Sequence, residues 1–332
     1  MNDATRLRLG TRGSQLALWQ ARTVAARIAA AGGPACEIIV IKTDGDRLQE
    51  RPLSEIGGKG LFVKEIEDAL LGGQIDLAVH SSKDMSAVLP DGLTIAGVLP
   101  RENPLDAVVL PVSRQPSAMT IEGLVGILGA SPSIGTGSVR RIAQLSRLFP
   151  GARFAGIRGN LDTRLRKLDE GAHDAIVLAA AGLRRLGFAS RISLSIPAAA
   201  CVPAAGQGIV AIEIRGDDAR ARDAVARINA AAAGDALAAE RALVEHLGGG
   251  CQTPVGALAS LCDGDMLELV AVVAALDGSR VVRGQARGPR REAAALGTRV
   301  GAQLMDDGAG DILAEARRIQ NKSQVSSLKS QE

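Results

Sequence analysis

The sequence predicts two similar α/β domains that face each other across a cleft, two crossover segments between them, and a small C-terminal α+β domain. Short apolar runs that suit buried strands alternate with stretches of helical period. The segments 100–104 and 203–208 have the proline or glycine content of crossovers. A short internal repeat relates the first unit to the second.

Composition narrows the class of protein. A chain of 332 residues with 46% hydrophobic residues is long enough for about two or three domains with real cores. Apolar runs stay shorter than a membrane span, and no signal peptide is recognisable behind Met1, so we expect a cytoplasmic protein with no membrane partner. The four cysteines are widely scattered, which predicts neither a metal site nor a disulfide framework.

Charge does not indicate a nucleic-acid partner. The net charge is only +3, and aromatic residues, which would stack on bases, make up 2% of the chain. Arginine nevertheless supplies 32 of the 39 basic residues. A genome rich in G and C would favour arginine too, so the positions of the arginines must carry the functional argument.

The first unit begins with a predicted strand over 7–11 and a helix for which Ser14 is a natural N-cap. Arg12 lies beside the start of that helix. Together with the free backbone N–H groups of the helix N-terminus, it makes a plausible anion site. A second strand is predicted over 37–41 and a further helix over 61–71.

The stretch from Asp76 to Asp84 is the first candidate for a functional site. It starts as an apolar run typical of a buried strand and ends in the polar residues His80 to Asp84. Ligands of open α/β sheets bind beyond the carboxyl ends of strands, so Lys83 and Asp84 are placed where a reacting group and its counter-charge are useful. The alternative is a strand followed by a solvated turn.

The polar, glycine-rich segment 42–60 precedes this strand and carries Lys59. Its composition predicts a mobile loop or lid. The spacing does not match a phosphate-binding P-loop.

A second unit begins near Asp106, with strands predicted over 107–110 and 133–135. Gly135-Thr136-Gly137-Ser138 repeats the pattern of residues 10–14, because each lies between an apolar run and a helix. The strand after Asp174 likewise repeats the strand after Asp76. The repeat predicts anion-binding loops on the facing edges of two similar domains.

Arginines gather at the predicted strand-to-helix turns of this unit. There, backbone amides and a guanidinium can converge on one carboxylate or phosphate. The arginines concerned are Arg140, Arg141, Arg158, Arg164, Arg184 and Arg185.

The remaining chain predicts a return strand to the first sheet over 209–214 and then a third unit. Three glycines precede Cys251, which leaves this thiol little steric cover. The expected elements are helices over 217–232, 235–246 and 293–306, and strands near 257–260 and 266–274. We expect domain 1 to comprise residues 4–101 and 208–228, domain 2 residues 105–202, domain 3 residues 230–318, and a disordered tail residues 319–332.

Six motifs together resemble the porphobilinogen deaminase (hydroxymethylbilane synthase) family, in the family's order and over about residues 6–318. They are Thr11-Arg12-Gly13-Ser14-Gln15-Leu16-Ala17-Leu18, Gly57-Gly58-Lys59-Gly60-Leu61-Phe62-Val63-Lys64-Glu65, His80-Ser81-Ser82-Lys83-Asp84, Arg158-Gly159-Asn160-Leu161-Asp162-Thr163-Arg164-Leu165, Pro203-Ala204-Ala205-Gly206-Gln207-Gly208 and Gly249-Gly250-Cys251-Gln252-Thr253-Pro254.

The resemblance implies a monomeric transferase of periplasmic-binding-protein-like fold with a small third domain. In this family a dipyrromethane primer is attached by a thioether to the cysteine matched by Cys251. Four porphobilinogen units are added to it, each losing ammonia, and water then releases the linear tetrapyrrole. No metal is implied.

The resemblance also implies roles for individual residues. Asp84 is the expected catalytic residue, because a carboxylate can stabilise the azafulvenium cation that ammonia loss leaves. The expected cofactor-binding residues are Cys251, Lys83, Ser138, Arg140, Arg141 and Arg164. The expected substrate carboxylate-binding residues are Arg12, Ser14, Gln20, Lys59, Thr136, Gly137, Arg158 and Arg185.

Three positions depart from the family pattern, namely Glu55, Gly137 and Ser86. In the family a second loop lysine, a serine and a proline are common there. Gly137 bears on carboxylate binding, whereas none of the three touches the expected chemistry of Asp84 or Cys251.

Two other classes share some of these features. A two-domain receptor for small anions would have the cleft and the arginines but no role for Cys251, which would then be a small buried or loop residue. A nucleic-acid-binding regulator would place the arginines on phosphates, although the chain lacks a helix-turn-helix pattern as well as aromatics.

Overall fold

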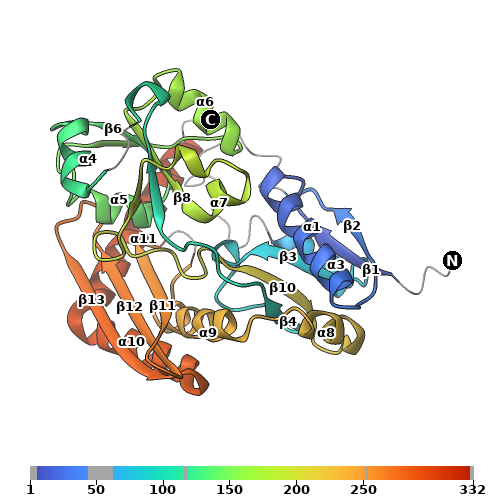
Figure 1. Cartoon of the computed structure of the whole chain (residues 1–332). Coiled ribbons are helices and arrows are strands. Elements are labelled where there is room, and N and C mark those ends of the chain that lie inside the picture. Colours follow the sequence, from blue (N-terminus) through green and yellow to red (C-terminus); the bar gives the residue numbers. More distant parts are fainter. Residues whose placement is uncertain (1–5, 44–62, 116–118, 251–252, 330–332) are drawn as a thin grey trace.

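The computed structural model describes residues 6–43, 63–115, 119–250 and 253–329, with side chains described as far as Ile319. Two five-stranded sheets and one three-stranded sheet form three groups of elements, which are separate in Figure 1. The predicted fold class, two similar α/β units and a small C-terminal α+β unit, is confirmed.

The first sheet has the strand order β2-β1-β3-β10-β4. β1 pairs in parallel with β2 and β3, whereas β10 runs antiparallel to both of its neighbours. The predicted return of the chain to the first sheet through β10 is therefore confirmed. The strands are β1 (Leu7–Thr11), β2 (Cys36–Val40), β3 (Leu77–Ser81), β4 (Leu93–Val98) and β10 (Val210–Arg215).

Helices cover both faces of this sheet. α1 (Gln15–Ala30) and α8 (Ala219–Ala226) pack on the face that contains Leu9 and Leu77, whereas α3 (Lys64–Leu71) packs on the face that contains Ala78. Successive strand residues point to opposite faces, so an almost continuous apolar run is needed for a sheet buried on both sides. β3 has that run.

The second sheet has the order β7-β6-β8-β5-β9. Its directions match those of the first sheet strand for strand, with parallel pairs around β6 and antiparallel pairs around β5. The predicted internal repeat is thus confirmed at the level of topology. The strands are β5 (Asp106–Val109), β6 (Ser133–Gly135), β7 (Arg153–Ala155), β8 (Ala175–Ala179) and β9 (Leu194–Ile196).

The repeat extends to single hydrogen bonds. The backbone N–H of Arg8 donates to Asp76 at 2.7 Å, and the N–H of Ser133 donates to Asp174 at 2.8 Å, each across the start of a parallel pair. Ser14 accepts from the N–H of the third residue after it, and Ser138 does the same. The two units therefore use the same cap at the same turn.

The helices of the second unit also lie on both faces of their sheet. α4 (Ile121–Leu128) and α5 (Val139–Leu145) pack on one face. α6 (Leu161–Asp169) and α7 (Ala180–Arg185) pack on the other.

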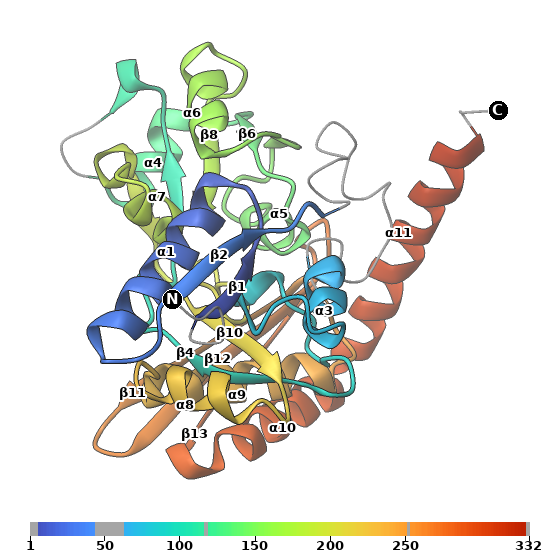
Figure 2. The same ribbon diagram turned by 90° about the vertical axis from the view of Figure 1, so that its right-hand side faces the viewer.

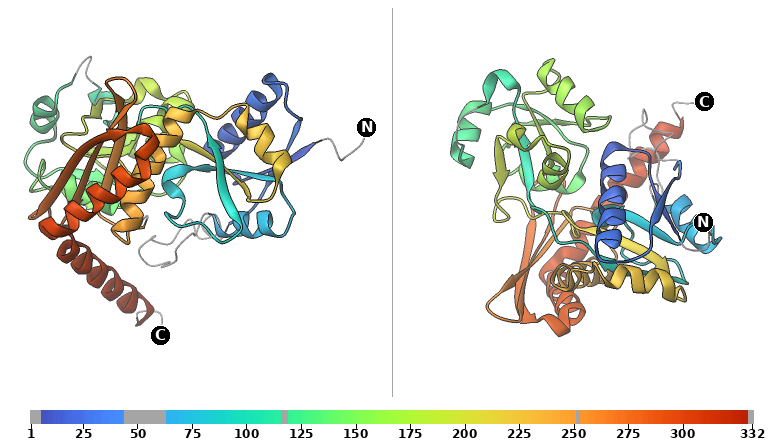
Figure 3. Two further views of the ribbon diagram at one scale, coloured as in Figure 1. Left: turned by 90° about the horizontal axis from the view of Figure 1, so that it is seen from below. Right: turned by 45° about the vertical axis from the view of Figure 1, so that its right-hand side comes forward.

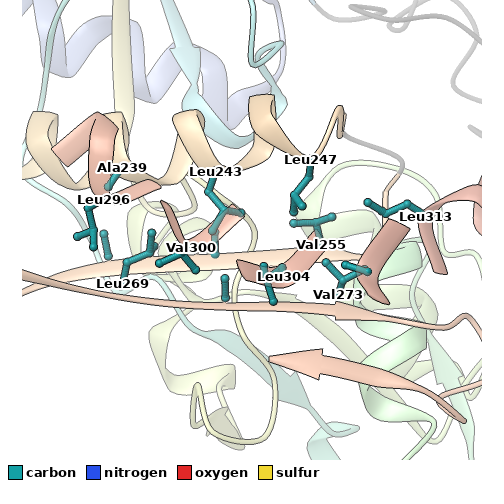
Figure 4. Close-up of a cluster of buried hydrophobic side chains, with 14 of the residues drawn as sticks. Ala239, Leu243, Leu247, Val255, Leu269, Val273, Leu296, Val300, Leu304 and Leu313 are labelled. Carbon is teal, nitrogen blue, oxygen red and sulfur yellow. The ribbon is translucent and has the colours of Figure 1, made fainter. Parts of the chain in front are cut away.

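The third unit is an antiparallel meander of β11 (Val255–Cys262), β12 (Met266–Ala274) and β13 (Val281–Pro289). α9 (Ala231–His246) and α10 (Ala293–Leu304) cover one face of it. Figure 4 shows their side chains, such as Leu243 and Leu304, meeting those of the strands in one apolar layer.

Shorter turns and a last helix complete the chain. The 3₁₀ turns are η2 (Ser82–Asp84), η3 (Val112–Arg114), η4 (Ala189–Arg191) and η5 (Arg290–Glu292), and a π turn, η6 (Met305–Ala309), precedes α11 (Gly310–Lys329). Figures 2 and 3 show α11 projecting away from the three sheets.

The structure differs from the sequence predictions in two helices. α11 continues to Lys329, so the expectation of a disordered tail is wrong for residues 319–329. That stretch contains neither proline nor glycine to end the helix. The single helix predicted over 217–232 is also wrong, because α8 ends at Ala226 and α9 begins at Ala231.

Arg101 and Glu240 tie the crossovers to the third unit. Arg101 donates to the fully buried carboxylate of Glu240 and to the carbonyl oxygens of Gln207 and Ala259. Glu240 in turn accepts from the N–H groups of Gly206 and Ala259 at 2.6 and 2.7 Å. Both charged side chains therefore have several hydrogen-bond partners, as a buried ion pair requires.

Candidate active site

Asp84 lies just beyond the carboxyl end of β3, as the sequence predicts. The strand ends at Ser81, and the 3₁₀ turn η2 carries Lys83 and Asp84 past the edge of the sheet. Two contacts fix the turn. The N–H of Ser82 donates to Ile209 at 3.0 Å, and Met85 packs in an apolar cluster with Leu237 of α9.

A small pocket opens in front of this turn. Its volume is about 70 Å³, and its polar lining comes from α1, from the loop before α1 and from β3 with its turn. The polar residues that line it are Arg12, Ser14, Gln20, His80, Ser81 and Asp84. A liquid water occupies about 30 Å³, so the pocket takes a group the size of a carboxylate arm.

Gln20 is fixed in this pocket by Ser81. Its Nε2 donates to Ser81 Oγ at 2.9 Å, and its side chain is only 1% exposed. The pair joins α1 to the end of β3, so the helix and the turn that carries Asp84 are held in one geometry.

A buried cluster of charges lies in the second unit. Arg140 donates to the carboxylate of Asp106 at 2.7 and 3.1 Å, and Arg141 donates to it from Nε at 2.9 Å. Asp106 is fully buried, and the two arginines are 4% and 8% exposed. Two cations thus share one anion, which leaves the cluster with an excess of positive charge.

Lys83 links the two units electrostatically. Burial lowers the pKa of Lys83, and the charges of Arg141 and Arg140 lower it further, while Asp84 and Asp106 raise it. Lys83 comes from the first unit and the arginines come from the second. The turn that carries Lys83 and Asp84 therefore interacts electrostatically with the arginine cluster of the second unit.

Arg164 is part of the same charge cluster. Burial lowers its pKa, and Arg141 and Arg158 lower it further, whereas Asp84 raises it. The Nε of Arg164 donates to the carbonyl of Gly159 at 2.8 Å, which fixes the guanidinium at the start of α6. Neighbouring cations repel one another unless an anion joins them.

The loop before α5 holds the three small residues of the second repeat. Thr136 is buried, and its Oγ1 accepts from the N–H of Ser138 at 3.3 Å. Gly137 is exposed, and a Cβ built on it meets nothing within 4 Å. The departure at Gly137 therefore leaves room for the serine that the family pattern has there.

Arg185 lies at the other side of the junction, against the first unit. Its guanidinium carbon is 5.6 Å from the ring centre of Trp19 on α1, and Nη2 donates to the carbonyl of Gly208 at 2.7 Å. Burial lowers the pKa of Arg185. The residue contacts both α1 and the second crossover.

The structure thus gathers two sets of the predicted residues. Arg12, Ser14, Gln20 and Asp84 line the small pocket, and the charges of Lys83, Arg140, Arg141 and Arg164 interact with one another. Two predicted residues, Lys59 and Cys251, lie outside the described part of the chain, as does Glu55.

Sequence reasoning missed Asp106 and the role of Gln207. Gln207 Nε2 donates to Asp106 at 3.0 Å and to the carbonyl of Pro104 at 2.7 Å. The signal for Asp106 was a charged residue opening a fully apolar strand, since such a charge is buried only with a partner. A second missed pair is His80 of β3 and Glu213 of the neighbouring strand β10, whose buried side chains lie 2.9 Å apart.

Models of known protein families match most of this chain. Residues 7–223 match the model of the porphobilinogen deaminase dipyrromethane cofactor binding domain, and residues 235–306 match the porphobilinogen deaminase C-terminal domain. The chain belongs to the porphobilinogen deaminase family.

Three relatives carry the same name. Porphobilinogen deaminase of Syntrophobacter fumaroxidans is 44% identical over 94% of this chain and 98% of its own. That of Geobacter metallireducens is 44% identical over 93% and 94%, and that of Chromobacterium violaceum is 46% identical over 92% and 96%. The chain is a transferase of tetrapyrrole biosynthesis that condenses porphobilinogen on a dipyrromethane cofactor.

The chain is also similar to solved structures of periplasmic binding domains, at low identity. The periplasmic VFT2 domain of Bordetella pertussis BvgS has a TM-score of 0.38 and 16% identity over 68% of this chain and 87% of that chain. An ancestral cationic amino acid solute binding protein has a TM-score of 0.40 and 14% identity over 68% of this chain and 89% of that chain.

Within the described residues no helix is long and apolar enough to cross a membrane.

Proposed function

We propose that Asp84 is the catalytic residue and that the residues around it divide into a substrate pocket and a cofactor wall. Arg12, Ser14 and Gln20 bind a carboxylate arm of porphobilinogen in the small pocket. Lys83, Ser138, Arg140, Arg141 and Arg164 bind the carboxylates of the cofactor. Thr136, Gly137, Arg158, Arg185 and Lys59 bind further carboxylates of the substrate.

The observation that carries this proposal is the repulsion among the cations. The pKa of Lys83 and the pKa of Arg164 are both lowered, by burial first and then by neighbouring arginines. A protein that holds several cations close together, with one buried carboxylate between two of them, is built to receive an anion. Dipyrromethane carries carboxylates on each pyrrole, so it fits this donor set.

The role of Asp84 follows from its place beside the cations. Loss of ammonia from porphobilinogen leaves a pyrrolic cation, and a carboxylate fixed beside the pyrrole N–H stabilises that charge as it develops. The same carboxylate can hold the proton that ammonia departure requires. Lys83 and Arg164 both interact electrostatically with Asp84, so the carboxylate lies among cations.

When bound, dipyrromethane supplies the free pyrrole carbon to which the first substrate unit is joined. We propose that Cys251 holds it through a thioether. In the sequence this thiol follows three glycines, in the segment between α9 and β11. The residues of the wall then orient the carboxylates and exclude bulk water from the reacting carbon.

The mass of the purified protein tests the cofactor assignment. We expect the intact mass to exceed that of the bare chain by two linked pyrroles, with a colour reaction toward an aldehyde reagent for pyrroles. Cys251→Ser should remove both signals, and Cys262→Ser, which replaces a half-buried free thiol, should keep both. A wild-type mass equal to the bare chain contradicts the assignment.

The proposed domains are 4–101 with 208–228, 105–202, and 230–318. Each sheet has an apolar cluster whose buried residues all lie in one of these proposed domains, which supports this division. We also propose a cytoplasmic monomer without a nucleic-acid partner. The exposed large apolar side chains of the described residues, such as Val40, Val112 and Leu261, are dispersed over different elements. Light scattering of the purified protein measures the oligomeric state.

A further inference from the structure

We propose that Asp106 is the positioning residue for the arginine pair that binds the cofactor, and that it anchors this pair to both crossovers. The proposal rests on the proposed function of Arg140 and Arg141. It adds a residue that does not itself contact the cofactor and that lies outside the family motifs of the sequence.

The geometry of Asp106 fits one purpose, which is to hold two guanidinium groups in fixed planes. Its Oδ2 accepts from Arg140 Nη1 at 2.7 Å, and its Oδ1 accepts from Arg140 Nη2 at 3.1 Å and from Arg141 Nε at 2.9 Å. Each guanidinium group also donates a hydrogen bond to a backbone carbonyl oxygen. Arg140 donates to Val202 at 2.7 Å, and Arg141 donates to Val177 at 2.8 Å.

Neutral donors keep Asp106 in place without adding charge. Gln207 donates to Asp106 Oδ1 at 3.0 Å, and the thiol of Cys201 donates to Oδ2 at 3.5 Å. Burial raises the pKa of Cys201 to about 12, with the charge of Asp106 as a further cause, so the thiol stays protonated as a donor. The carboxylate is therefore saturated by donors, while the arginine pair keeps an excess positive charge.

Asp106 also lies where the two crossovers meet. It is the first residue of β5, two positions after the end of the first crossover, and Gln207 belongs to the second crossover. Gln207 also donates to Pro104 at 2.7 Å, so both crossovers meet at this carboxylate. The arginine pair is thus fixed to the junction between the two α/β units.

Asp106→Asn tests the proposal in the full-length protein. The amide keeps the shape but loses the negative charge and one pair of acceptor sites. We expect the fraction of protein that carries the cofactor, read from the intact mass, to fall about tenfold or more, as when outer partners of bound groups are removed. The loaded remainder should keep its KM for porphobilinogen within about twofold, because Arg12, Ser14 and Gln20 are untouched.

A matched control separates positioning from general stability. Asp169 of the same unit pairs with Arg191 at 2.7 and 3.0 Å in a more exposed setting, and Asp169→Asn should leave loading unchanged. If Asp106 served only stability, Asp106→Asn would lower the melting temperature of loaded and unloaded protein equally. Positioning predicts that loading stabilises the wild type more than the variant.

A second variant covers the case in which Asp106→Asn does not fold. Gln207→Met has a similar size but removes the donor to Asp106 while retaining the charge. We expect the folded variant to load about threefold less than wild type. Full loading of folded Asp106→Asn, or of Gln207→Met where the first variant is insoluble, overturns the proposal. A wild type without cofactor would refute the proposed function instead.

Discussion

The guanidinium carbon of Arg185 lies 5.6 Å from the ring centre of Trp19, so a side chain of α7 in the second unit stacks on α1 of the first. Such cation–π contacts contribute about 0.5–2 kcal/mol. Trp19 is the chain's single tryptophan. Its emission therefore reports on the junction at which the substrate carboxylates are proposed to bind.

Arg185→Ala should change the emission of Trp19 and raise KM for porphobilinogen by about tenfold or more, the cost of one charged hydrogen bond. The control is Arg184→Ala, which removes the exposed neighbouring arginine. It should leave both the fluorescence and KM unchanged. An unchanged KM in Arg185→Ala would remove this arginine from the substrate site.

Asp84→Asn should keep the fold and lower the rate of ammonia release by about 10²–10³-fold, because the amide cannot stabilise a developing cation as the carboxylate does. Circular dichroism checks the fold, and an ammonia assay checks the rate. Asp91→Asn, an exposed change seven positions later, is the control and should retain full activity. Ammonia release within a few fold of wild type in Asp84→Asn would contradict the assigned role.

Two glycine substitutions should behave oppositely. Gly137→Ser restores the residue common in the family, and a Cβ there meets nothing within 4 Å. The free energy of unfolding should change by less than about 0.5 kcal/mol.

Gly206 has a φ of +71°, and a Cβ built on it would lie 2.5 Å from Ser82 Oγ. Gly206→Ala should therefore cost about 1–3 kcal/mol.

Gly206→Ala should also reduce turnover, because Ser82 belongs to the turn that carries Asp84. Chemical denaturation and a steady-state assay of both variants make the comparison. Equal stability of the two variants would show that a Cβ at position 206 does not clash with the turn that carries Asp84.

Stability at acid pH should depend on Asp106. Burial alone would raise the pKa of its carboxyl, but Arg140 and Arg141 hold it well below the usual 3.8. The unfolded chain then binds more protons than the folded one below about pH 4, so stability rises with pH in that range. The contribution is fully present above the unfolded pKa and is lost as pH falls below it.

Urea denaturation measures this contribution in a Cys251→Ser background, where the cofactor adds nothing. Asp106→Asn should be less stable by about 3–5 kcal/mol at pH 7, the cost of breaking a buried ion pair. The difference between the two proteins should shrink as the pH falls below about 4. A difference that stays constant down to pH 2 would show that the charge of Asp106 is not what stabilises the fold.

Much of the site could be predicted from residues that are close in sequence. Ser14 and Ser138 cap helices three residues ahead, and Lys83 and Asp84 follow a strand whose apolar run marks it as buried. Local rules decide such features, because a cap or a strand end depends on its immediate neighbours. The motifs then indicated the family, which the comparisons confirm.

The partners of Asp106 could not be predicted in this way. Arg140 lies 34 positions away and Gln207 lies 101 positions away, and no local rule selects one arginine among many. Strand β13 was missed for a related reason. Its arginines and glycines break the alternation expected of a strand, and pairing with β12 decides its structure instead.

Periodicity and spacing along the chain were enough to predict the two repeated units, the turn that carries Asp84 and the types of residue proposed to bind an anion. Which of the charged groups lie close together could be seen only in the folded chain. Burial removes water from Lys83, Asp106, Arg140 and Arg164 together, and charges interact strongly once water is excluded. That neighbourhood exists because two crossovers bring both sheets to one carboxylate.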